Sequence, residues 1–112
     1  MDQCRQYILN AELVPVPCDD IVAWGKWFEK ADRTMASNKT RGGVLVSTVF
    51  LGLDHGFTSA GPPVLWETMI FGGPLDEYQL RYCTYADAMA GHACMWFEAR
   101  HAEVLTRQLG LM

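Results

Sequence analysis

The 112-residue chain has few basic residues and no long apolar run. Nine Lys and Arg against 13 Asp and Glu give a net charge of −4, which argues against a nucleic-acid partner, because such proteins gather cations around phosphates. The only local excess of positive charge is interrupted by acids and is typical of a solvated face: Lys26, Lys30, Arg33, Lys39 and Arg41. The longest nearly unbroken apolar stretch, GGVLVSTVFLGL, is far shorter than the ~20 residues that cross a membrane. We expect no membrane segment.

Several motifs are also missing. The four cysteines are scattered and form no C-x-x-C pair, which predicts free thiols in a reducing compartment. Cys94, Glu98 and His101 share one face of an expected helix, but their spacing matches no tetrahedral zinc pattern. Phosphate-loop, dinucleotide-binding and hydrolase motifs do not occur. We predict no metal and no cofactor. The amino-terminal MDQCRQYIL has no basic segment leading into an apolar stretch, so we expect a cytoplasmic protein.

The residues that are present favour one folded domain over 1–112. Half of them are hydrophobic, far above the composition of disordered chains. Strand-forming runs at 44–53 and 64–72 are expected to pair, and the apolar residues on both faces of the first run predict a sheet covered on both sides. The sequence predicts an α+β fold, with a small antiparallel sheet of three to five strands packed against two helices.

The remaining elements follow from shorter patterns. Short or edge strands are expected at residues 6–17 and at the stretch QLRYC. An exposed strand or loop is expected at residues 34–43. A helix over 19–32, capped by Asp19 or Asp20, carries three aromatics in five positions and is expected to contribute strongly to the core. An alanine-rich helix over 84–108 is expected to begin at Thr84, where Thr84-x-x-Asp87 resembles a capping box. It contains Gly91, whose missing side chain would let the backbone approach the sheet.

Asp54 and His55, directly after the first strong strand, are the sharpest candidate site. A carboxylate beside an imidazole can hold its tautomer for proton transfer. Adjacent side chains on a strand point to opposite faces, however, so His55 needs another partner, such as Glu67 or His92. The alternative is a strand exit in which Asp54 bonds the backbone of its own turn. We favour the turn, and we interpret Glu67 as more often structural than catalytic.

Three stretches resemble a family of small uncharacterised proteins encoded by phages and prophages. They are VSTVFLGLDHGF, GPPVLWETMIFGGPLDEYQLRY and the following T-x-x-x-A-x-A-G-H, and the similarity extends from about Tyr7 through the helix containing His92. The resemblance implies a bacterial host cell and an accessory gene on a mobile element. Small accessory proteins of this kind often act by binding, for example by blocking a host enzyme or defence complex.

The leading hypothesis is therefore a non-enzymatic binding module that occupies a host protein or a small ligand. Loops 54–63 and 71–78, displayed by rigid strands, are its expected surface. We also expect an exposed apolar patch with Trp66 or Trp96, serving a partner or a homodimer. The expected binding residues are Asp54, His55, Phe57, Trp66 and Tyr78. The alternative is a small acid–base enzyme or ligand-binding protein that uses His55 with Glu67 or His92.

Overall fold

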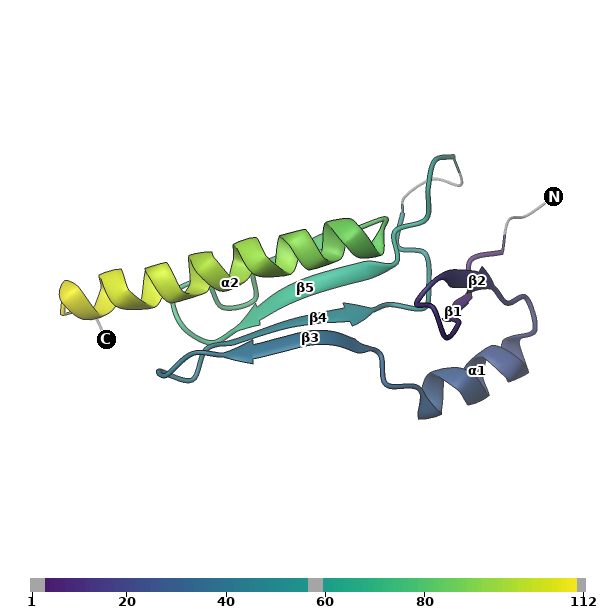
Figure 1. Cartoon of the computed structure of the whole chain (residues 1–112), viewed down its shortest axis with the longest axis horizontal. Helices are drawn as coiled ribbons and strands as arrows, with labels where there is room; N and C mark the ends of the chain where they lie inside the picture. The colour runs from purple at the N-terminus through teal and green to yellow at the C-terminus, as the bar shows by residue number, and fades with distance from the viewer. Residues whose placement is uncertain (1–3, 57–59, 111–112) are drawn as a thin grey trace.

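The computed structural model describes residues 4–56 and 60–110. Its elements in chain order are β1 (Tyr7–Leu9), β2 (Pro15–Pro17), α1 (Ile21–Lys30), β3 (Thr34–Lys39), β4 (Leu45–Phe50), β5 (Trp66–Phe71), β6 (Gln79–Tyr82) and α2 (Tyr85–Gln108). Strands β3 to β6 form one antiparallel sheet in the order β3-β4-β5-β6, and β1 pairs with β2 in a separate two-stranded sheet. The predicted α+β fold with a small antiparallel sheet is confirmed (Figure 1).

The two central strands pair along their whole length, from Leu45 opposite Phe71 to Phe50 opposite Trp66. Because side chains alternate across a strand, this register separates the sheet into two unlike faces. One face is almost fully buried and carries Val46, Thr48, Phe50, Trp66, Thr68 and Ile70. The other face is half-buried or exposed along β4 and β5. The prediction that both faces are covered is therefore wrong, because a helix lies over only one of them.

Helix α2 covers the buried face of the sheet. Its first turn is capped by Thr84, whose hydroxyl accepts from the Asp87 N–H at 3.0 Å, as the sequence predicts. The side facing the sheet carries Ala88, His92, Met95, Ala99 and Glu103. At 24 residues the helix is about 36 Å long, whereas a six-residue strand spans about 20 Å. Its carboxyl end accordingly extends past the strands (Figure 1).

Helix α1 lies at the opposite end of the molecule, beside β1 and β2 (Figure 1). Asp20 caps it by accepting from the N–H groups of Val22 and Ala23, but none of its ten residues is buried. Trp27 meets the Phe50 ring edge-on, with centroids 5.9 Å apart. The prediction that this helix contributes strongly to the core is wrong, because α2 already fills the buried face of the sheet.

Projecting elements at both ends give the molecule an extended shape. Its principal extents are 56 × 29 × 20 Å and its radius of gyration is 16.3 Å, against about 13 Å for a compact chain of this length. Within the described ranges, no helix combines the length and apolarity needed to span a membrane.

Candidate functional site

Asp54 ties together the two ends of the loop that follows β4. Its Oδ1 accepts from the Gly56 N–H at 2.8 Å and from the Val64 N–H at 2.9 Å. Partial burial acts to raise the pKa of this carboxyl, but the two backbone donors and the nearby charges of Arg5 and His55 outweigh burial and lower the pKa below its usual value. The side chain thus makes the turn at the strand exit, in agreement with the geometry favoured from the sequence.

His55 takes part in the same strand exit. Its Nδ1 lies 2.8 Å from the Leu53 carbonyl oxygen, which can only accept, so Nδ1 carries the proton. Arg5 adds bonds from its guanidinium to the carbonyl oxygens of Asp54 at 2.7 Å and Gly56 at 3.3 Å. The imidazole and the neighbouring carboxylate are therefore both engaged with backbone groups and not with each other.

Trp66 and Tyr78, two of the other expected binding residues, differ in burial. Trp66 is 1% exposed in the core, and its indole N–H has no hydrogen-bond partner within the described part of the chain. It therefore presents no surface to a partner. Tyr78 is half exposed and lines an apolar cavity of about 350 Å³ beside α2. Phe57 lies outside the described residues.

The described residues of loop 54–63, which are 54–56 and 60–63, do not form one surface with loop 71–78. The first precedes β5 and the second follows it, so the length of this six-residue strand, about 20 Å, separates them. They lie at opposite ends of the sheet (Figure 1).

Glu67 lies on the uncovered face of the sheet. Its Oε2 accepts from the Arg81 Nε at 2.8 Å across the β5–β6 pair, where the two residues are directly opposite each other. This ion pair joins neighbouring strands and gives Glu67 a structural role. The sequence did not indicate that its partner would be an arginine.

His92 lies on the covered face, inside a buried polar chain. Its Nε2 is 2.7 Å from Asn38 Oδ1 and therefore donates, which leaves Nδ1 to accept from the Thr48 hydroxyl at 2.7 Å. Thr68 then donates to Thr48 at 2.5 Å, and the Tyr82 hydroxyl donates to Thr68 at 3.1 Å. Burial lowers the pKa of His92 and so favours the neutral ring that this chain requires.

The three residues of the acid–base alternative are consequently not assembled. Glu67 and His92 occupy opposite faces of one sheet, and His55 lies beyond its end. General acid–base catalysis requires groups within hydrogen-bond reach of one reacting atom. In residues 4–56 and 60–110, no cluster of three or more His, Cys, Asp or Glu side chains could hold a metal ion.

The carboxyl half of α2 forms a surface that the sequence did not reveal. Phe97, Val104, Leu105 and Leu109 are between 44% and 70% exposed. Phe97 stacks on His101 with ring planes 6° apart. Since α2 buries Met95, Ala99 and Glu103 against the sheet, Phe97 and Val104 lie on its outer side, seven residues apart. The helical spacing was readable from the sequence, but the side of the helix that stays uncovered was not.

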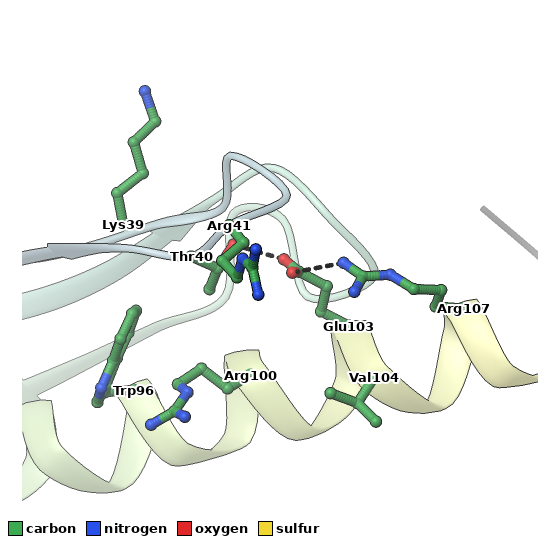
Figure 2. A pocket seen from close by; sticks show the side chains of 8 residues that line it. All are labelled: Lys39, Thr40, Arg41, Trp96, Arg100, Glu103, Val104 and Arg107. Carbon is green, nitrogen blue, oxygen red and sulfur yellow. Dashed lines mark hydrogen bonds and ion pairs between the residues drawn. The ribbon is translucent and has the colours of Figure 1, made fainter.

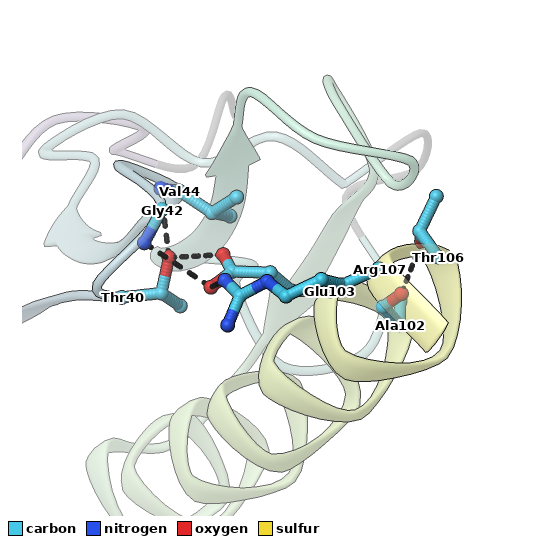
Figure 3. A network of polar contacts seen from close by, with 7 residues as sticks. All are labelled: Thr40, Gly42, Val44, Ala102, Glu103, Thr106 and Arg107. Atoms are coloured by element: carbon cyan, nitrogen blue, oxygen red, sulfur yellow. Dashed lines mark hydrogen bonds and ion pairs between the residues drawn. The ribbon is translucent and has the colours of Figure 1, made fainter. Parts of the chain in front are cut away.

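A second feature of the same half is a carboxylate clamp between α2 and the β3–β4 turn (Figure 3). Glu103 is 4% exposed. It accepts from the Thr40 hydroxyl, from the Gly42 N–H at 3.1 Å and from Arg107 at 3.1 Å. The hydrogen bond from Thr40 lowers the pKa of Glu103. Burial acts to raise this pKa, but Gly42 and Arg107 lower it further, so the pKa lies below its usual value. The carboxylate therefore stays charged and holds the turn on the helix.

Beside the clamp is a cavity of about 430 Å³. Its lining comprises Lys39, Thr40, Arg41, Trp96, Arg100, Glu103, Val104 and Arg107. Lys39 and Arg41 belong to the positive charges that we interpreted from the sequence as a solvated face, and the fold brings Arg41 opposite two arginines of α2 (Figure 2).

Comparisons of the chain with protein-family models, with curated proteins and with solved structures gave no match in any of the three.

Proposed function

We propose that the protein is a non-catalytic interaction module that binds a partner protein through the outer face of α2. The observation that carries this proposal is the exposed apolar row on the carboxyl half of the helix: Phe97, Val104, Leu105 and Leu109. Such a row fits the mode in which a helix lays apolar anchors at i and i+7 into a groove of another protein. The expected occupant is therefore a protein with an apolar groove.

Two features of the fold support this reading. The end of α2 extends past the strands, so a partner can enclose it without displacing the sheet (Figure 1). The helix is also held firmly, because its other side is buried and the Glu103 clamp fastens it to the β3–β4 turn. A surface that is already ordered loses little conformational entropy on binding.

The proposed biological setting is that of an accessory phage protein that occupies a host enzyme or defence complex. A non-catalytic role suits the arrangement of the candidate acid–base residues, which lie in three different parts of the fold. The acid–base alternative has less support for the same reason. A homodimer through the same helix face is the competing assembly.

Affinity capture from a bacterial host, with matched variants of this protein, tests the proposal. Phe97→Glu places a charge on the proposed surface, whereas Val22→Glu changes a side chain of similar exposure on α1, which lies at the other end of the molecule. We expect the wild type and Val22→Glu to retain the same protein, and Phe97→Glu to lose it at least tenfold. Both variants should keep the unfolding midpoint of the wild type.

Two outcomes would contradict the proposal. One is equal retention of the captured protein by Phe97→Glu and the wild type. The other is a wild-type homodimer in sedimentation that Phe97→Glu converts to a monomer, which would assign this face to self-association.

A further inference from the structure

We propose that the cavity between the β3–β4 turn and α2 binds an anionic small molecule that carries a flat ring, with nucleoside phosphates as the ligand class. The cavity, about 430 Å³, has the size of a small-molecule site. Figure 2 shows Arg41 reaching from the turn toward the helix, Arg100 beside Trp96, and Arg107 extending to Glu103; Lys39 points away. The cavity borders the proposed protein-binding face and shares Val104 with it, whereas Phe97 lies outside the cavity lining.

The charge of the cavity is positive in an otherwise acidic protein. Apart from Lys39, three arginines and one acid line it, while the whole chain carries −4. Glu103 uses both of its oxygens on Thr40, Gly42 and Arg107. Among the described residues, Arg41 and Arg100 therefore have no carboxylate partner. Two guanidinium groups without a counter-ion at one cavity match the oxygen geometry of a phosphate or carboxylate.

The turn that carries Arg41 is fixed in place. Thr40 and Gly42, on either side of Arg41, both donate to Glu103. A β-carbon at position 42 would lie 2.8 Å from that carboxylate, so only glycine fits there without a shift. Glu103 is thus a positioning residue that sets where the Arg41 guanidinium can reach, and it is not itself a contact for the anion.

The ring preference follows from the rest of the lining. Trp96 is half-buried against the core cluster of Val44, Val46 and Met95, and the same side chain lines the cavity with Val104. Arg100 already lies over the indole, 5.4 Å from its centroid. An indole face beside guanidinium groups stacks a base and pairs a phosphate at the same time. An oligonucleotide is disfavoured, because the cations form a single cavity and not a track.

Calorimetric titration of the intact protein tests the assignment. The probes are the four common ribonucleoside diphosphates, inorganic phosphate, and adenosine. We expect at least one diphosphate to bind tenfold or more tightly than phosphate or adenosine alone. Arg41→Gln and Arg100→Gln should each weaken that binding about tenfold or more, as loss of a charge-assisted contact predicts. Arg81→Gln, a cation of the uncovered sheet face, should leave it unchanged.

Separate outcomes overturn the proposal. Absence of binding by all four diphosphates at millimolar concentration would do so, as would phosphate binding equal to nucleotide binding. Tighter binding of single-stranded oligonucleotides would assign the site to a polymer instead. Leu109→Glu charges the exposed apolar row at a position outside the cavity lining and should keep the nucleotide affinity of the wild type, so failure here and failure of the protein-binding face are distinguishable.

Discussion

The two helices of this protein differ in how deeply they are buried, and α1 is less buried than its sequence suggests. Helix α1 carries Trp24, Trp27 and Phe28, yet none of its residues is buried. Helix α2 turns two alanines, a histidine, a methionine and a glutamate toward the sheet, and all five are buried. The comparison shows that small residues on the sheet-facing side of α2 favour its packing on the sheet, because they let the backbones approach closely.

Gly91 and Tyr82 show how close that approach is. A β-carbon at position 91 would lie 2.1 Å from the Tyr82 hydroxyl, which ends the polar chain through Thr68, Thr48 and His92. By contrast, α1 contacts the rest of the molecule through the edge-on packing of Trp27 against Phe50 and through two hydrogen bonds. The Trp24 indole N–H donates at 3.1 Å to the carbonyl oxygens of both Tyr7 and Gly52.

The largest expected difference between the two regions comes from their tryptophans. Trp66→Ala empties a fully buried site under α2 and should lower the free energy of unfolding by about 3–5 kcal/mol. Trp24→Ala removes a half-buried side chain and should cost only about 1–2 kcal/mol. Chemical denaturation followed by circular dichroism measures both. An equal loss in the two variants would show that α1 contributes to the core as strongly as α2.

Substitution of glycine by alanine is expected to change the free energy of unfolding in opposite directions in the two helices. Gly91→Ala should destabilise by about 1–3 kcal/mol, because the Tyr82 ring must move. Gly25→Ala in α1 meets no atom within 4 Å and should stabilise by up to about 1 kcal/mol through helix propensity. Thermal unfolding of the two variants gives the comparison.

The cause of the Gly91 effect can be isolated with a double-mutant cycle. In a Tyr82→Ala background the added methyl group has room, so Gly91→Ala should lose most of its cost. A cost that stays the same in that background would mean that the Tyr82 contact does not set the spacing between α2 and the sheet.

The last comparison concerns the strand exit near α1. Asp54→Ala removes two backbone contacts and should cost about 1–2 kcal/mol, with faster hydrogen exchange at Gly56 and Val64. Because the pKa of Asp54 is lowered on folding, its contribution is present above about pH 4 and is lost as the pH falls below that value. His55→Gln should leave both exchange rates near those of the wild type. Protection unchanged in Asp54→Ala would refute the turn-making role.

Local patterns predicted most of the elements and part of the site. Both strong strands, both helices and their caps at Asp20 and Thr84 follow from neighbouring residues, as does the turn made by Asp54. The assignment of Trp66 to a binding surface was wrong, because the burial of an aromatic side chain depends on which sheet face the helix covers. The arginine-lined cavity was missed, since its lining comes from two segments, 39–41 and 96–107, that are more than 50 positions apart in the chain.

By itself, the sequence determined the α+β composition, the pairing of the two apolar strands and the glycine that lets α2 approach the sheet, because hydrophobic period, capping and backbone freedom are short-range properties. Only the tertiary structure decided that one sheet face stays open, that Glu103 fastens the β3–β4 turn, and that Arg41 lies near Arg100. Those outcomes depend on contacts between segments that lie far apart in the chain. Alanine, glycine and methionine let α2 approach the covered face closely, whereas α1 lies beside β1.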